Sequence, residues 1–377
     1  HNRDFCPRWN DYRGDSIMTI NVTKPSVNLR EKLNELETNK GLKGNEILQA
    51  ETAQEVRSLI GAGRKNLIIN GGFDVWQRGT PRVTTEYCAD RWMVWSTNAG
   101  VTNRAVTATK GTGSIAGLGY KAKYTSFSFG TVDTGIEKLA WGQKIEASSL
   151  NNINVGDSLT LSYYIKKEQS MPTDNSFYTR ILTPSPSGTD AWAAGYLWQN
   201  DETIAATLNT TTFNSLSTSW TKVSHTFTAT ATMISDGMAV YWHVGDNNMN
   251  VTSTSALVSF TGVQLELGSV ATDFEHRSYG EELALCQRFF IAAPEVTGRY
   301  TGSSTGISQI WVDFPNHMRG SPTVTTYGTG GYPNNPGKYD RDGVGNVSCN
   351  TVGRKYGFIV YNLTGPGQFG YHADAEL

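Results

Sequence analysis

This sequence of 377 residues is short of charge. Lysine and arginine together number 32, aspartate and glutamate 34, and charged residues make up 18% of the chain. A net charge of −2 leaves no basic surplus to neutralise a phosphate backbone, so nucleic acid is not an expected partner. No run of 18 apolar residues occurs, so we expect no membrane insertion. The first sixteen residues lack the apolar core of a signal peptide, and residues 1–18 are expected to form an irregular extension.

The motifs of common enzymes are also missing. The four cysteines stand singly, with no CxxC pair, which argues against zinc and redox sites. The six histidines show no HxxxH or HExxH spacing, and neither a GxSxG elbow nor a P-loop occurs. No two carboxylates stand in a context that fixes them at glycosidase separation, and no β-helix repeat is visible. We therefore expect no enzyme activity, no metal and no cofactor.

Charged residues are most frequent in the N-terminal 65 residues, of which we call 19–65 the leader. Residues 1–65 hold 11 lysines and arginines and 9 acidic residues, which predicts a domain boundary near residue 65. Two short amphipathic helices are predicted within 19–65, and helices of this length are marginal alone in water. We expect them to pack against sister chains or a docking partner, most simply in a closed homotrimer. The apolar positions expected to make these contacts are Leu29, Leu33, Leu36, Val56, Leu59 and Ile60.

Beyond residue 65, apolar residues recur at every second position. In residues 158–168, Leu159, Leu161, Tyr163 and Ile165 fall on one face of an extended chain, and similar runs recur with Gly, Asn and Asp between them. This pattern predicts a mainly β protein, with an antiparallel β-sandwich or jelly roll over 66–278. A connecting helix is expected at 279–291, followed by a small all-β module at 292–377.

Aromatic residues are abundant, with ten tryptophans and seventeen tyrosines. Aromatic faces stack on sugar rings, and neighbouring polar groups bind the hydroxyls. One predicted loop combines both and becomes the candidate carbohydrate site: Trp192, Tyr196, Trp198, Asp190 and Gln199. The alternative is that these rings belong to the core or to subunit contacts. Trp220 and Trp242 are predicted to be core residues.

Three stretches carry a resemblance to a known family. They are "NLIINGGFDVWQRGT" (66–80), "CADRWMVW" (88–95) and "FTGVQLELGSVATDFEHRSYGEELALCQRFF" (260–290), preceded by the leader "INVTKPSVNLREKLNEL" (20–36). Together they resemble a recurring module of tailed-bacteriophage tail fibres and related virion appendages. The resemblance implies a jelly-roll domain similar to carbohydrate-binding modules, displayed as a trimer on the virion and made in the host cytoplasm.

The opening stretch is also similar to the first strand of calcium-containing carbohydrate-binding modules. In those modules an acidic residue at the position of Asp74 helps to hold a structural ion. The partner carboxylate of that family is replaced here by Thr261 and Gly262, and calcium usually needs more than one carboxylate. No metal is therefore expected.

Two functions follow from these expectations. The first is a virion fibre or appendage that attaches to other virion proteins through residues 19–65 and contacts a host surface glycan with its β domains. The second is a purely structural decoration, neck, tail or adaptor protein that anchors another receptor-binding protein. A free carbohydrate-binding module of a bacterial enzyme is a weaker third alternative, because no catalytic domain is visible.

Overall fold

The computed structural model describes most of the chain after residue 64. Residues 1–64, with the predicted extension and the six leader positions Leu29, Leu33, Leu36, Val56, Leu59 and Ile60, lie outside this part. Among the described residues no helix is long and apolar enough to cross a bilayer. The described ranges are 65–80, 82–84, 87–98, 101–102, 106–129, 136–172, 175–192, 202–245, 249, 251–298, 309–327, 338–339, 345–346, 348–350, 355–361 and 367–376.

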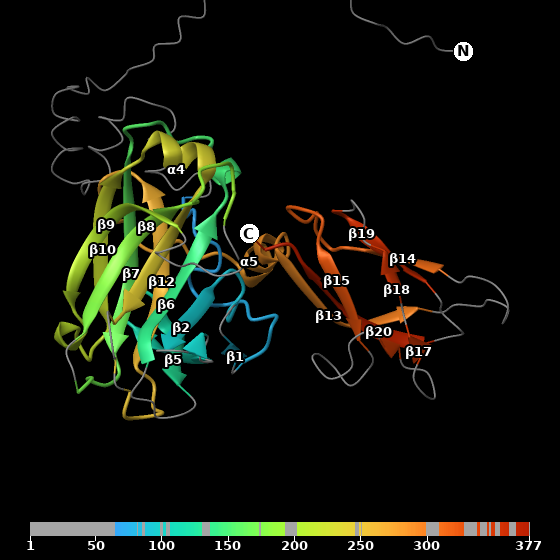
Figure 1. Ribbon diagram of the computed structural model, residues 1–377, viewed down its shortest axis with the longest axis horizontal. Helices are drawn as coiled ribbons and strands as arrows, with labels where there is room; N and C mark the ends of the chain where they lie inside the picture. Colours follow the sequence, from blue (N-terminus) through green and yellow to red (C-terminus); the bar gives the residue numbers. More distant parts are fainter. Residues whose placement is uncertain are drawn as a thin grey trace, which may run out of the picture. The chain divides into compact units, whose positions relative to one another are not determined.

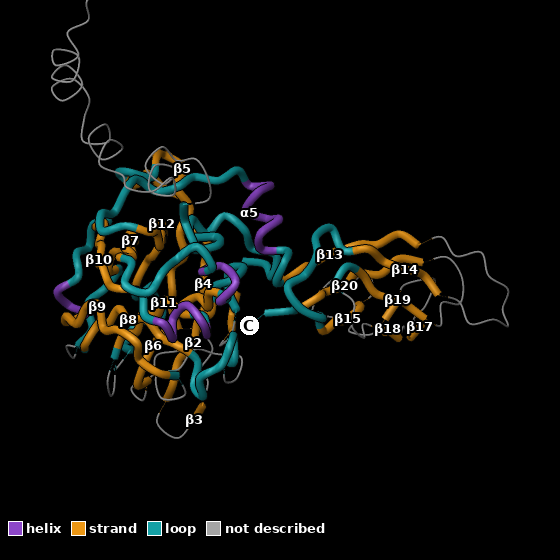
Figure 2. The backbone as a smooth tube through the Cα atoms, turned by 90° about the horizontal axis from the view of Figure 1, so that it is seen from above, coloured by secondary structure: helices purple, strands orange, loops and turns teal. Residues whose placement is uncertain are grey.

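Two six-stranded antiparallel sheets form a sandwich, as the period-two pattern predicts (Figures 1 and 2). Figure 2 shows them as two facing layers. Sheet A has the order β1 (Arg82–Thr84), β4 (Val106–Ile115), β5 (Gly119–Phe129), β12 (Val258–Leu267), β7 (Ser158–Lys167) and β10 (Thr221–Thr228). Sheet B has the order β3 (Val101–Thr102), β2 (Met93–Asn98), β6 (Ile136–Ile145), β11 (Met238–Val244), β8 (Ser176–Thr183) and β9 (Thr203–Thr212).

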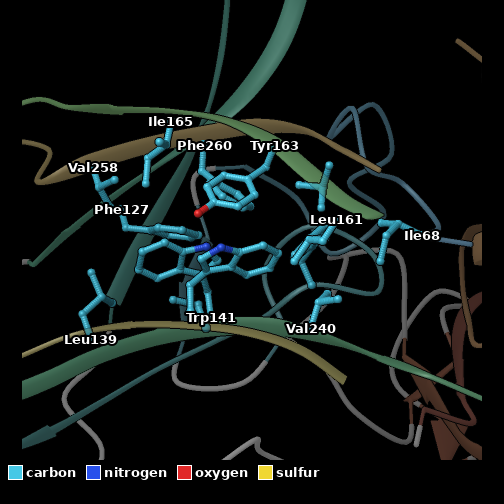
Figure 3. Close-up of a cluster of buried hydrophobic side chains, with 14 of the residues drawn as sticks. Ile68, Phe127, Leu139, Trp141, Leu161, Tyr163, Ile165, Val240, Val258 and Phe260 are labelled. Atoms are coloured by element: carbon cyan, nitrogen blue, oxygen red, sulfur yellow. The ribbon is translucent and has the colours of Figure 1, made fainter. Parts of the chain in front are cut away.

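The space between the sheets is filled by large aromatic rings (Figure 3). Phe260 of sheet A lies 4.7 Å from Trp242 and 5.6 Å from Trp141 of sheet B, measured between ring centroids. Both tryptophans are at most 1% exposed. Burying a side chain of this size stabilises the fold by about 2–3 kcal/mol. The prediction that Trp242 is a core residue is confirmed.

The other predicted core tryptophan is elsewhere. Trp220 precedes β10 and lies half-buried on the outer side of sheet A, where its ring contacts Tyr124 at 5.3 Å. The prediction that Trp220 is a core residue is therefore wrong, because Trp220 lies on the side opposite the inward residues of the strand that follows it. The strand begins at Thr221, and the residues that point inward are Val223, His225 and Phe227.

The opening stretch is a hydrogen-bonded junction. Asn70 adopts a left-handed conformation (φ 58°), and its side chain accepts from Val75 N–H and donates to the carbonyls of Val75 and Asp90. The indole of Trp92 donates to the Asn70 carbonyl at 2.8 Å. A side chain at Gly71 would overlap the carbonyl oxygen of Val263, so the chain approaches β12 more closely than alanine allows.

The closing stretch completes the same junction from the other end of the domain. Glu275 accepts from Asn66 N–H at 2.8 Å, and Glu282 accepts from Asn70 N–H. Arg277 pairs with both carboxylates, at 2.9 Å to Glu275 and 3.3 Å to Glu282. The three stretches that carry the family resemblance therefore meet in space and build the fold.

The helices of the described chain are short. Helix α5 (Tyr279–Cys286) begins at a capping box, in which Ser278 and Glu281 exchange hydrogen bonds. It is shorter than the predicted 279–291, because Phe289 packs as a buried residue and Phe290 already starts a strand. The others are α4 (Ala231–Asp236) and the 3₁₀ helices η1 (Ala147–Leu150) and η2 (Phe213–Ser215).

The C-terminal residues form small antiparallel sheets around a separate apolar cluster that includes Phe314, Phe358 and Tyr371. One sheet has the order β13 (Phe290–Gly298), β20 (Gly367–Asp374) and β15 (Thr323–Tyr327). The second has the order β14 (Gln309–Asp313), β19 (Gly357–Tyr361) and β18 (Ser348–Asn350), and β16 (Lys338–Tyr339) pairs with β17 (Gly345–Asn346).

Buried ion pairs join this module to the sandwich. Glu376 pairs with Arg91, whose guanidinium also lies 3.5 Å from the centre of the Phe289 ring. Arg78 is the second arginine, 3.3 Å from Asp374 and 3.5 Å from Glu376. The two pairs of Glu376 are shielded from solvent because all three side chains are at most 5% exposed, whereas Asp374 is 45% exposed.

Candidate functional site

The outer side of sheet B, which we call the sheet B face, carries aromatic and polar side chains in cross-strand rows. In one row Trp95, Ala140, His243 and Tyr178 stand opposite one another on β2, β6, β11 and β8. The next row holds Met93, Gly142, Tyr241 and Arg180 on the same strands. The β6 residues in these rows, Ala140 and Gly142, have small or no side chains. The large side chains on β2 and β11 therefore flank β6, and these two strands lie about 9–10 Å apart by strand spacing.

His243 is the most unusual residue of this face. Its side chain is 0% exposed, and neither ring nitrogen has a hydrogen-bond partner among the described residues. Burial, aided by the positive charges of Arg180 and Lys138, lowers the pKa of His243 to about 3. The imidazole is therefore neutral at ordinary pH and offers one donor and one acceptor to its surroundings.

Other buried polar atoms on the sheet B face also find no hydrogen-bond partner among the described residues. The hydroxyls of Tyr241 and Tyr87 and the indole nitrogen of Trp192 are buried and find no hydrogen-bond partner within the described part of the chain. At least nine in ten buried polar groups in native proteins are hydrogen-bonded. Such a group of buried donors and acceptors among aromatic rings is unusual, and it makes the sheet B face the candidate site.

Charged side chains stand at the margin of the face, and one of them, Lys144, is only 1% exposed. Tyr178, Arg180 and Trp192 are half-buried, and the Arg180 guanidinium lies 4.3 Å from the centre of the Tyr178 ring. The ammonium of Lys144 lies 5.5 Å from the centre of the Trp192 ring. Burial lowers the pKa of Lys144 to about 8, against the opposing charge of Glu202.

Comparison with known proteins gives no family. No protein-family model matches the chain, and no curated protein matches it in sequence. Three solved structures are distantly similar. The enzymatically active domain of tailspike protein 4 from bacteriophage CBA120 is 13% identical with a TM-score of 0.33, over 54% of this chain and 21% of its own. A Stig cyclase from Fischerella sp. TAU is 14% identical with a TM-score of 0.31, over 55% of this chain and 98% of its own.

The third is the CBM22-1 xylan-binding domain of Xyn10C from Paenibacillus barcinonensis. It is 12% identical with a TM-score of 0.27, over 56% of this chain and 100% of its own. This chain spans only about a fifth of the tailspike structure's length. Likeness at these scores carries no argument about what this protein does, so the function must be argued from its own residues.

The residues predicted from sequence are only partly described. Trp192 packs against the apolar cluster of the sheet B face. Asp190 lies nearby, but its carboxylate accepts from Ala147 N–H at 3.0 Å and lies 3.7 Å from Arg319, so it is engaged within the fold. Tyr196, Trp198 and Gln199 lie outside the described residues.

Sequence reasoning missed the centre of the face. The run Met238–Val244 alternates Met, Val and Trp with Ala, Tyr and His, and every residue in it is buried. The sequence did offer a signal, since this strand carries aromatic residues on both of its faces. Only one face can pack against the core of the sandwich, so the other must pack against something else.

Asp74, the position where the resemblance implies a calcium ligand, has a different environment. Lys123 places its ammonium 2.7 Å from the Asp74 carboxylate, and the Lys110 ammonium donates to the Asp74 carbonyl at 2.7 Å. Thr261 and Gly262, which replace the partner carboxylate, line one pocket together with Asp74. In the part of the chain that the structure describes, no group of three or more His, Cys, Asp or Glu is placed to hold a metal. A lysine thus neutralises this carboxylate.

Proposed function

We propose that this chain is a carbohydrate-binding structural protein of a bacteriophage virion, and that the sheet B face is its glycan site. The observation that carries the proposal is the group of buried polar atoms on Tyr241 and His243 that find no hydrogen-bond partner among the described residues. His243 lies in the row between Trp95 and Tyr178, and Tyr241 lies in the next row. A sugar ring has apolar C–H faces for the rings and hydroxyls for the polar atoms. Satisfying a buried donor or acceptor contributes about 1–3 kcal/mol to binding.

The place of the protein in the particle follows from the sequence resemblance. In this proposal residues 19–65 attach the chain to other virion proteins and assemble it as a homotrimer, and the β domains project. Linking three weak sites raises the apparent affinity for a host surface by orders of magnitude. No catalytic step is part of the proposal.

A structural role is the second candidate, because Ala239, Tyr241 and His243 are each 0% exposed. Under that alternative the sheet B face is a second core, and the protein decorates the particle or anchors another fibre. The two functions make different predictions for residues at the margin of the face.

The experiment is a glycan array and a host-cell adsorption assay with the full-length chain. Trp192→Ala and Trp198→Ala should each reduce binding by about tenfold, because each removes an aromatic platform. Tyr356→Ala, at a tyrosine 51% exposed on the C-terminal module, is the matched control and should bind like the wild type. Wild-type binding by both tryptophan variants would favour the structural role.

A further inference from the structure

A pocket lies on the outer side of sheet A, away from the sheet B face. It has a volume of about 210 Å³ and is lined by Asp74, Lys121, Lys123, Phe274 and His276, among others. Pockets for drug-sized ligands span about 300–1,000 Å³, so this one fits a single small unit. We call it the sheet A pocket.

The backbone is shaped to open this pocket. Strand β12 bulges between Thr261 and Gln264, and Gly262 takes a left-handed conformation (φ 59°). A Cβ at Gly262 would lie 2.8 Å from a methyl carbon of Leu118, so a larger residue would push on the pocket wall. The bulge turns the wall formed by β12 away from the regular sheet and leaves the space beside Phe274.

The charge of the sheet A pocket is positive. The ammonium groups of Lys110 and Lys123 both lie 2.7 Å from oxygens of Asp74, and Lys121 is exposed on the pocket wall. The pocket lining thus holds two lysines and one carboxylate, which Lys123 already neutralises, while Lys110 binds the backbone of Asp74. The segment that supplies Phe274 and His276 also carries the exposed Asp273 and the ion pair between Glu275 and Arg277. The ammonium groups of Lys222 and Lys65 donate to the carbonyls of Thr272 and Asp273 in this segment.

Aromatic side chains continue from the pocket across the outer side of sheet A. Phe274 belongs to one apolar cluster with Tyr164, Tyr124 and Trp220. Tyr124 and Trp220 meet edge to face at 5.3 Å, and the Lys166 ammonium lies 5.4 Å from the Trp220 ring centre. The Phe274 ring itself is half-buried and contacts His276 at 5.1 Å.

We propose that the sheet A pocket binds one acidic sugar unit, a hydroxylated ring that carries a carboxylate. The Phe274 ring packs against the apolar face of the sugar. Lys121 and Lys123 bind its carboxylate, and Asp74 accepts from a hydroxyl. Neighbouring units of the same saccharide lie along Tyr164, Tyr124 and Trp220. This site is separate from the sheet B face and does not depend on it.

The test is a titration of the full-length chain with three probes: glucuronate, glucose and acetate, followed by NMR shifts or calorimetry. Glucuronate should bind saturably in the millimolar range and weaken as salt is raised. Glucose should bind about tenfold more weakly, because it lacks the charge-assisted hydrogen bonds. Acetate should not compete at equal concentration. Equal affinity for glucose and glucuronate, or for acetate and glucuronate, would overturn the proposal, as would the absence of saturable glucuronate binding.

Variants locate the binding. Lys121→Gln should reduce glucuronate affinity by about tenfold and leave the fold intact, because Lys121 is exposed on a strand. Lys355→Gln, at an exposed lysine of the C-terminal module, is the matched control and should change nothing. Tyr241→Phe should leave glucuronate binding here unchanged, which separates this site from the sheet B face. Wild-type glucuronate affinity in Lys121→Gln would refute the assignment.

Discussion

The ring of His243 stacks on the ring of Tyr178 with their centroids 4.3 Å apart and their planes 21° from parallel. Tyr241 approaches the same imidazole at 5.4 Å. His243 is thus enclosed by aromatic rings and positive charges, and its two nitrogens remain without partners among the described residues. This arrangement has a thermodynamic consequence that does not require any ligand.

His243 should make the fold less stable in acid. Its pKa is about 3 in the folded chain, and an unfolded histidine titrates near 6.5. Between these values the unfolded state binds more protons. The free energy of unfolding therefore falls by up to about 1.4 kcal/mol per pH unit as the pH drops below 6.5.

Asp90 opposes this trend, because burial raises its pKa to about 6, so its folded form gains stability as the pH falls towards 4. Denaturant unfolding of wild type and His243→Gln, measured from pH 7.5 to 4, isolates the histidine. The variant should lose less stability than the wild type over this range. Parallel pH profiles for the two proteins would contradict the buried neutral imidazole.

The pair between Arg91 and Glu376 should hold the C-terminal end of the chain to the sandwich. Both side chains are at most 5% exposed. Breaking a buried ion pair costs about 3–5 kcal/mol. Since glutamine retains an acceptor, we expect Glu376→Gln to cost about 2–4 kcal/mol.

Asp374→Asn is the matched control, because Asp374 contacts the neighbouring Arg78 but is 45% exposed. Exposed pairs contribute about 0–1 kcal/mol, so this variant should unfold almost like the wild type. Urea midpoints of the two variants give the comparison. Equal losses in both would show that burial of the Glu376 pair has no special effect.

The glycine at position 71 should be irreplaceable for steric reasons. A methyl group there would meet the carbonyl oxygen of Val263, so Gly71→Ala should lower the melting temperature by several degrees. Gly280 lies in α5 with open space around its Cβ position, and alanine there should stabilise the helix by about 0.5–1 kcal/mol. Thermal scans of the two variants check both expectations. A Gly71→Ala variant with the melting temperature of the wild type would refute the close approach to β12.

The local pattern was sufficient to predict the sandwich. In β7, the predicted inward set of Leu159, Leu161, Tyr163 and Ile165 is buried in the core, because period-two alternation reports which face is apolar. Where the independently folding units begin and end stays a prediction.

The site itself was beyond local reasoning. Asn70 has its role only because distant residues close around its turn: Glu282 accepts from Asn70 N–H, and Val263 N–H donates to the carbonyl of Gly71. The rows that join Trp95, His243 and Tyr178 depend on the register of four strands, which no short window contains. Trp192 was found because aromatic composition is visible locally, whereas its neighbours on the sheet B face come from other strands.

The leader makes a prediction about stoichiometry. If the stripe of Leu29, Leu33 and Leu36 packs against sister chains, the 377-residue chain should form a particle of three times its own mass of 41.3 kDa. Light scattering coupled to gel filtration measures this directly. Leu29→Ser combined with Leu33→Ser should shift the mass towards one chain, and a wild-type monomer would contradict the proposed assembly.

The central claim is that the sheet B face binds carbohydrate, and Tyr241→Phe tests it most directly. This change removes one buried hydroxyl that has no partner among the described residues and keeps the ring. Measured on the same preparation, the variant should unfold at a temperature equal to or higher than the wild type, yet bind the glycan identified on the array about tenfold more weakly. A variant that is less stable but binds the glycan with wild-type affinity would contradict the account, because the hydroxyl would then serve the fold alone.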